Sequence, residues 1–239
     1  MTSILPSVRA RLKERFIFNF RLHPDVMQDY LPVDWLKPDE VRGHAIATFC
    51  VLDLSNITVS PLPAVAGFSS VSCAQRYAVL DSTFQPAEPA VFVADRYTNS
   101  AFGSWFTKLG FSAPHPYAKA VVSCNSGITE LVIEAENGDL LCSAEFEISD
   151  NDESAVFDVK SFAAFISKGV KSYGPSRHGD RLTKVDLLKD DTIYQPLTLR
   201  SIKGAAVDDW KKNGGVFDSA YRTTGGVYEW QYHGMTAGE

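Results

Sequence analysis

Hydrophobic and polar residues alternate with a period of two over many short stretches of this chain, which is the pattern of β-strands. The clearest case is a pair of alternating runs over residues 128–136 and 139–148. Asn137 and Gly138 separate them, and these residue types favour the positive φ angles of a two-residue type I′ turn. The pattern therefore predicts a β-hairpin with Asn137 and Gly138 at its two central positions.

The same reading predicts further strands and a few helices. Strands are expected over 16–22, 43–54, 68–80, 90–98, 117–124, 182–188, 192–202 and 227–232. Helices are expected in the first dozen residues and over 26–31, 100–109 and 205–212, whereas 157–170 fits neither period. About eleven strands against three or four helices predict a mainly β fold, an antiparallel barrel or sandwich with a few peripheral helices. No shift in composition divides the chain, so residues 1–239 are expected to form a single domain.

Charge and hydropathy exclude two classes of partner. The net charge is −6 and the pI is about 5.4, so the chain lacks the concentrated basic surface that nucleic-acid binding requires. The basic run near the start (Arg9, Arg11, Lys13 and Arg15) is predicted to be a solvated helix face. The longest uncharged run, 54–75, contains Pro61, Pro63 and Gly67 and cannot be a membrane span. The start of the chain also lacks a signal peptide's apolar centre, and we expect a cytoplasmic protein.

Cysteine and histidine spacing indicates neither a metal site nor a disulfide framework. The four cysteines are scattered without a C-x-x-C pair, and no two of the five histidines have the i, i+4 spacing of a helical metal site. The chain also lacks a G-x-S-x-G elbow, a Walker loop and a dinucleotide-binding G-x-G-x-x-G motif. We therefore expect no metal and no cofactor.

A series of short motifs between Phe16 and about Ile148 resembles the acetoacetate decarboxylase-like family, including an uncharacterised bacterial branch of it. The motifs occur in the same order and with similar gaps. They are Leu31-Pro32, Arg42-Gly43, Arg76-Tyr77, Val91-Phe92-Val93 ending at Asn99, a helix with Gly110, and Pro116-Tyr117 with Ala120. The resemblance implies a cone-shaped antiparallel β-barrel with a pocket inside.

The resemblance also implies a chemistry, and the sequence departs from it at two positions. In decarboxylases of this family a lysine directly follows the proline that opens the 117–124 strand, and it forms a Schiff base with the β-keto acid. Tyr117 occupies that position here. The glutamate that the family places near 72–76 is also missing, with Ser72 or Gln75 in its place. Ordinary decarboxylase activity is therefore not expected.

Lys119 is the candidate catalytic residue that keeps Schiff-base chemistry open. It lies two residues after Tyr117, so both side chains leave a regular strand on the same face. Three interpretations follow. Lys119 lies in solvent on the outer face, or it points inward and pairs with an acid or a bound anion, or it is the nucleophile. The first is favoured because lysines are rarely buried.

Arg76, Arg96 and His115 complete the candidate site together with Tyr117. Arg76 alternates with small residues on its strand, so it either projects into the barrel as a fork for a substrate carboxylate or forms a salt bridge at the rim, which we favour from the sequence. Arg96 lies near the end of the neighbouring strand, and His115 is a loop residue at the expected mouth of the pocket.

The leading hypothesis is that the protein binds, and in one version transforms, a small organic acid or keto acid inside the barrel. Arg76 would anchor the carboxylate, and an enzyme of this kind would be a lyase of the acetoacetate decarboxylase-like group. The alternatives are a non-catalytic carrier or sensor of small molecules, and a structural homo-oligomer whose pocket is vestigial. No nucleic-acid or membrane partner is expected, and a homo-oligomer is left open.

Overall fold

The computed structural model describes residues 7–60, 67–107, 114–151, 154–168, 170–177, 181–190 and 192–236, with only the backbone described at 105–107. The helices are α1 (Pro24–Gln28), α2 (Ala101–Thr107), α3 (Val159–Lys168) and α4 (Ala205–Lys212). The strands of the first half are β1 (Ser7–Leu22), β2 (Leu36–Pro38), β3 (Glu40–Val41), β4 (His44–Val59), β5 (Phe68–Asp81), β6 (Glu88–Thr98) and β7 (Ala118–Asn125). Those of the second half are β8 (Ile128–Ala135), β9 (Leu140–Ile148), β10 (Lys171–Pro175), β11 (Leu182–Lys189), β12 (Tyr194–Lys203), β13 (Val216–Thr224) and β14 (Val227–Met235). The mainly β fold predicted from the sequence is confirmed.

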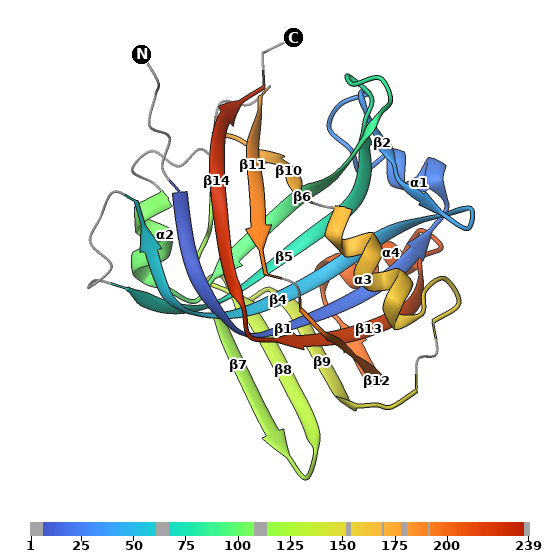
Figure 1. The fold of residues 1–239 in the computed structure, drawn as a ribbon. Coiled ribbons are helices and arrows are strands. Elements are labelled where there is room, and N and C mark those ends of the chain that lie inside the picture. The colour runs from blue at the N-terminus through green and yellow to red at the C-terminus, as the bar shows by residue number, and fades with distance from the viewer. Residues whose placement is uncertain are drawn as a thin grey trace.

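A closed barrel forms the main body of the fold (Figure 1). Its strands follow the order β4-β5-β6-β10-β11-β14-β1, and β1 closes the circle by pairing with β4. The pairs around the barrel are antiparallel except for β6 and β10, which run parallel and are joined only at Ser172–Val91 and Tyr173–Phe92. This short parallel pairing is the seam of the barrel.

Strand β1 connects the barrel to a second layer. It pairs with β4 along its length, with β14 through residues 7–11, and with β13 through residues 14–21. From β13 the sheet continues through β12, β9 and β8 to β7, and the β7–β8 hairpin projects away from the barrel (Figure 1). The barrel and the extension therefore share one strand.

The basic start of β1 corrects the prediction of a helix there. Ala10 and Leu12 are buried while Arg9, Arg11 and Lys13 are exposed, which is the alternation of a strand with one wet face. A shift in the pairing of β1 with β4 between Leu12 and Glu14 then changes which residues face inward. Arg15 is consequently buried, so it does not belong to the solvated face predicted for the run.

Two hydrophobic cores occupy the two faces of β1 and its neighbours. Phe16, Phe18 and Phe20 pack with Phe146 of β9 and Trp210 of α4, between the barrel wall and the second layer. The other core lies inside the barrel. Its lower end is closed by α3, whose Phe162 stacks on Tyr221 with ring centroids 4.0 Å apart.

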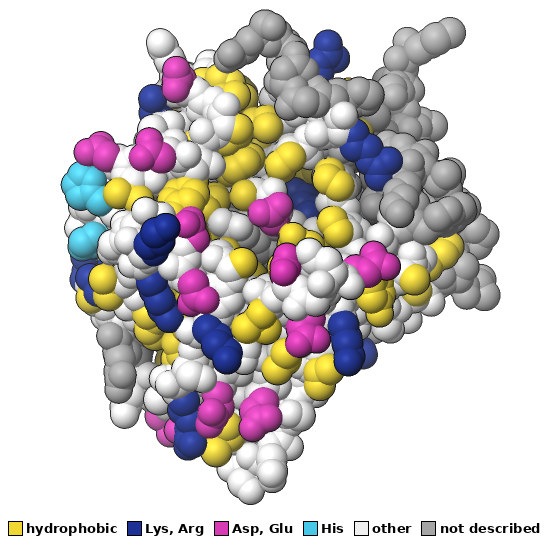
Figure 2. All heavy atoms as spheres, turned by 180° about the vertical axis from the view of Figure 1, so that it is seen from behind, with side chains coloured by type: hydrophobic (Ala, Val, Ile, Leu, Met, Phe, Trp, Pro, Cys, Tyr) yellow, Lys and Arg dark blue, Asp and Glu magenta, His cyan; other side chains and the backbone are white. Residues whose placement is uncertain are grey.

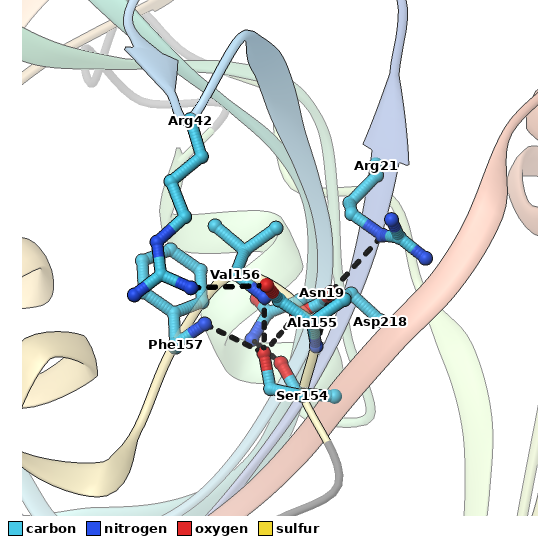
Figure 3. A network of polar contacts seen from close by, with 9 residues as sticks. Asn19, Arg21, Arg42, Ser154, Ala155, Val156, Phe157 and Asp218 are labelled. Carbon is cyan, nitrogen blue, oxygen red and sulfur yellow. Dashed lines mark hydrogen bonds and ion pairs between the residues drawn. The ribbon is translucent and has the colours of Figure 1, made fainter.

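A polar network fastens the segment before α3 to the barrel (Figure 3). The buried Asp218 carboxylate of β13 lies 3.0 Å from Arg21 Nε and accepts hydrogen bonds from the Ser154 hydroxyl and the Ala155 backbone N–H. The Ser154 hydroxyl in turn accepts from the backbone N–H of Phe157 at 2.7 Å. Satisfied hydrogen bonds offset the cost of burying this carboxylate, and they fix where α3 begins.

Strand β13 was not predicted from the sequence, and its burial pattern explains why. Asp218, Ser219 and Thr223 are polar yet buried, so the hydrophobic alternation of this strand is broken. Ser219 accepts a hydrogen bond from Asn19 of β1 at 3.1 Å. For Asp218 and Ser219, partners distant in the sequence, and not the local sequence, make a polar side chain suitable for the interior.

The predicted hairpin is present, but its turn differs from the prediction. Gly138 has φ of +88°, whereas Asn137 is not among the residues with positive φ. Gly138 N–H donates to the Ala135 carbonyl at 2.9 Å, and Ala135 N–H donates to that of Asp139 at 2.8 Å. This is a three-residue loop with glycine at a bulge position. The Asn137 side chain accepts from Asp139 N–H, which stabilises the longer loop.

Among the residues described, no helix is long and apolar enough to cross a bilayer.

The positive φ at Gly138 generates a stability prediction. Nothing lies within 4 Å of where a Cβ would be placed, so a substitution there is opposed by backbone strain alone. Gly138→Val should lower the free energy of unfolding by about 1–3 kcal/mol in urea titrations. Gly138→Asn should cost less, because asparagine tolerates this backbone region better than valine. Equal losses for the two variants would contradict the strain argument.

Candidate functional site

A cavity of about 230 Å³ lies inside the barrel. All seven barrel strands contribute side chains to it, and most of the wall is apolar. The apolar residues are Val8, Leu52, Leu54, Ile57, Val59, Phe68, Val91, Val93, Val185, Leu187 and Trp230. On the outer surface seen in Figure 2, hydrophobic side chains gather on the upper half of the molecule, with a basic side chain set back among them.

Strand β5 supplies one side of the cavity by simple alternation. Phe68, Ser70, Ser72, Ala74 and Arg76 are two residues apart, so they leave the strand on one face, and all five line the cavity. The small side chains in the middle leave space in front of the strand. Arg76 therefore reaches the cavity interior and not a salt bridge at the rim.

A β-bulge in β6 supplies the second arginine. Arg76 pairs with Val93 and Gln75 pairs with Asp95, so Ala94 is an extra residue opposite the step between them. In a regular strand the series Val91, Val93 would continue with Asp95. The bulge instead brings Arg96 to the cavity and leaves Asp95 exposed.

Gly174 of β10 makes room for the Arg96 guanidinium. A Cβ built on Gly174 would lie 2.6 Å from Arg96 Nη2 and 3.2 Å from the Val93 carbonyl oxygen. Gly174 has no positive φ, so the glycine is required by this close approach and not by backbone conformation. The shape of β10 thus fixes where Arg96 can lie.

The cavity carries positive charge without a matching carboxylate. Neither Asp nor Glu lines it, and neither Arg76 nor Arg96 forms an ion pair within the part of the chain that the structure describes. Arg76 Nε is buried without a hydrogen-bond partner there. Burial and the neighbouring Arg76 lower the pKa of Arg96 to about 10, and burial also lowers the pKa of Arg76. Both shifts have the direction expected when burial and neighbouring positive charge destabilise a guanidinium, and an anion in the cavity would offset this cost.

A buried cysteine and arginine lie beneath this charged region. Arg15 Nε donates to Cys50 Sγ at 3.1 Å, and both residues are fully enclosed by the barrel. Burial alone would raise the pKa of the Cys50 thiol, but the charges of Arg15 and Arg76 outweigh it and lower that pKa. Burial likewise opposes the charge of Arg15, yet Cys50 and Tyr228 raise its pKa. Cys50 is therefore the hydrogen-bond acceptor of a buried arginine.

Three hydroxyl groups line the cavity between the arginines and Phe68. Ser70 shares hydrogen bonds with Ser72 at 3.1 Å and with Thr98 at 2.6 Å. The Thr98 hydroxyl also accepts from the backbone N–H of Ser100. These hydroxyl groups form hydrogen bonds with one another and make a polar stripe along β5 and β6. Covering this stripe with an apolar group of a ligand therefore costs little free energy.

Of the residues predicted for the site, three line the cavity, namely Arg76, Arg96 and His115. The other two, Tyr117 and Lys119, do not. Ala118 is buried with 2% of its surface exposed and Ala120 is half-buried, so at the start of β7 the even-numbered positions are the buried ones. Tyr117 is 37% exposed, and Lys119 is exposed beside Glu134 of β8. The alternation argument for these two residues was sound, but the placement of Tyr117 in the pocket, which the family resemblance suggested, is corrected.

Several site residues were missed from the sequence. Trp230 and Tyr232 come from the last strand, and Arg15 and Cys50 come from strands whose pairing brings them beneath the cavity. A basic residue next to a strand rich in aromatics was the one available signal for Arg15. Within the described ranges no three His, Cys, Asp or Glu side chains converge in a way that could hold a metal ion.

Comparison with solved structures identifies the fold. The chain is similar to acetoacetate decarboxylase from Legionella pneumophila (TM-score 0.66, 13% identity, covering 97% of this chain and 87% of that one). It is also similar to an acetoacetate decarboxylase-like enzyme from Sphingomonas wittichii RW1 (0.62, 13%, 100% and 94%). A third match is the enduracididine biosynthesis enzyme MppR complexed with pyruvate (0.60, 13%, 99% and 91%). The fold is acetoacetate decarboxylase-like, as the sequence resemblance predicted.

No protein-family model matches the sequence, and no curated protein matches it significantly.

The pairing of Arg15 with Cys50 predicts an unequal response to two cysteine substitutions. Cys50→Ala leaves a buried guanidinium N–H without its acceptor and should lower the free energy of unfolding by about 3 kcal/mol. Cys142→Ala removes an equally buried thiol from apolar surroundings, and we expect a loss of about 1 kcal/mol. Chemical denaturation at pH 7 measures both. A loss at Cys50 no larger than that at Cys142 would show that the thiol is not the partner of Arg15.

Proposed function

We propose that the protein binds the carboxylate of a small organic acid in the barrel cavity through Arg76 and Arg96. The observation that carries this proposal is the pair of guanidinium groups facing an apolar cavity without a carboxylate lining it. A planar guanidinium offers two parallel N–H donors, which match the two oxygens of a carboxylate. Binding an anion would offset the repulsion between the two arginines.

The fold neighbours support a ligand of this chemical class. MppR was solved in complex with pyruvate, and in a second structure with the condensation product of pyruvate and imidazole 4-carboxaldehyde. Both ligands derive from a keto acid. The proposal for this chain rests on its own arginines and takes from the neighbours only the chemical class of the ligand.

The cavity argues against imine chemistry in this protein. None of the lysines in the described ranges lines it, and Lys119 lies on the exposed face of β7. An imine-forming lysine needs a desolvated setting that lowers the pKa of its ammonium group. We therefore favour a carrier or sensor of organic acids over a Schiff-base lyase.

His115 supports a second candidate function, namely proton transfer at the carbon next to the carbonyl of a bound 2-oxo acid. It lines the cavity together with the two arginines. In this reaction the imidazole would accept a proton from that carbon, and the arginines would stabilise the resulting enolate. The imidazolium would exchange its proton with solvent and then return a proton to the carbon. The residue is within the cavity wall, which a general base requires.

Calorimetric titration at pH 7 tests the binding proposal. Pyruvate and hexanoate should each bind more tightly than the uncharged amide of the same length. Arg76→Gln and Arg96→Gln should each weaken acid binding about 10- to 100-fold, the scale of a lost charge-assisted hydrogen bond. Lys119→Met removes a cation outside the cavity and should leave binding unchanged. Equal affinity for acid and amide would refute carboxylate recognition.

Deuterium exchange tests the proton-transfer candidate. In D2O the protein should catalyse exchange at C3 of 2-oxobutanoate, followed by proton NMR, and His115→Gln should abolish the exchange while leaving binding within about threefold. His233→Gln serves as the control, because His233 lies 3.0 Å from Asp186 on the surface and does not line the cavity. Binding without exchange would leave the carrier or sensor function as the one supported.

A further inference from the structure

The shape of the cavity points to a more specific ligand than a two- or three-carbon acid. We infer that the ligand is an elongated monocarboxylate with an apolar tail of about six carbons or more, its carboxylate at Arg76 and Arg96 and its tail toward Phe68. This inference rests on the proposed function, because it assumes that the arginines receive the carboxylate.

The length of the cavity is set by β5. Its lining side chains extend from Phe68 to Arg76, eight residues apart, which is about 26 Å of strand. The arginine side chains cover part of that length at one end. The small side chains Ser70, Ser72 and Ala74 and then Phe68 continue the lining from the arginines along β5, so a compact acid such as pyruvate held by the arginines would leave the Phe68 end unfilled.

The volume leads to the same conclusion. At about 30 Å³ for each water, 230 Å³ corresponds to about eight water molecules. Ligand pockets in proteins bury most of the surface of their ligand. A two-carbon acid would leave most of this cavity to water in contact with apolar walls, which the hydrophobic effect opposes.

The apolar wall that fits a tail begins beside the hydroxyl stripe, where Leu52 and Leu54 pair with Ser72 and Ser70. Leu52 and Leu54 of β4, Leu187 of β11 and Trp230 of β14 are inward-facing and apolar. Leu187 pairs directly with Trp230, and Trp230 pairs with Val8, so the apolar wall is continuous across three strands. Ile57 pairs with Phe68 and lies at the end farthest from Arg76 along β5.

The register of the strands therefore separates charge from hydrophobicity along the cavity. Arg96 is opposite Ala74, and Arg76 is two residues further along β5. Ile57 and Phe68 are opposite each other at the other end, and no charged residue lines the cavity between the two groups within the described part of the chain. An amphipathic acid matches this order in one orientation.

Titration of a homologous series tests the inference. Acetate, butanoate, hexanoate and octanoate are measured at pH 7, each beside its amide. Each methylene group buried against the wall should raise the affinity about three- to fourfold, so hexanoate should bind about 100-fold more tightly than acetate. The heat-capacity change of binding should become more negative with chain length.

A variant at the far end locates the tail. Ile57→Phe fills the end opposite the arginines and should weaken octanoate binding at least tenfold while leaving butanoate binding within about twofold. Val216→Phe, at an exposed position of β13, is the matched control and should change neither. If Ile57→Phe does not fold, the wild-type series still decides the question.

The possible outcomes separate the inference from the proposed function. Carboxylates that bind more tightly than their amides, with affinity independent of length, would overturn the inference and leave the proposed function standing. Amides that bind as well as acids, with affinity rising with length, would overturn the proposed function. The expected result is dependence on both charge and length.

Discussion

The whole structure depends on β1, which forms backbone hydrogen bonds with three other strands. Its N-terminal part closes the barrel between β14 and β4, and its C-terminal part begins the second layer at β13. Both of its faces are buried from Phe16 onward, one toward the cavity side and the other toward Phe146 and Trp210. Replacing this strand by a polar sequence would place polar residues in two hydrophobic cores. The positions of the cavity residues therefore depend on β1.

The interior charge is the second constraint. Arg15, Arg76 and Arg96 lie within one barrel, and Arg15 donates a hydrogen bond to the Cys50 sulfur. Enclosed like charges destabilise a fold unless something offsets them. Stability given up at a binding site is a recurrent feature of functional proteins. The cationic cavity is therefore better explained by a ligand than by the needs of the fold.

The sequence predicted the site where local alternation alone determines it. The small residues that alternate with Arg76 on β5 offered the barrel interior as one of two placements for it, although a salt bridge at the rim was favoured. The fold class followed from the number and pattern of strands. Arg96 reaches the cavity through a bulge at Ala94 that depends on the partner strand, so its orientation could not be predicted from β6 alone. The family resemblance placed Tyr117 at the pocket, whereas the structure leaves it outside the cavity lining next to the buried Ala118. Lys119 lies on the exposed face, which is the placement that the sequence favoured. The contact of Arg15 with Cys50 joins residues 35 apart in sequence, and no local pattern contains it.

The seam between β6 and β10 has a consequence for how a ligand enters. Barrel strands joined by many hydrogen bonds separate rarely, whereas a pairing of two residues is the part of the wall that opens at the lowest free energy. Arg96 lies directly behind this seam, in contact range of Gly174 on β10. An acid bound to Arg96 would therefore stabilise the β6–β10 pair from inside the barrel. The β6–β10 pair would open more often in the empty barrel than in the occupied one. A bound acid would therefore slow its own release.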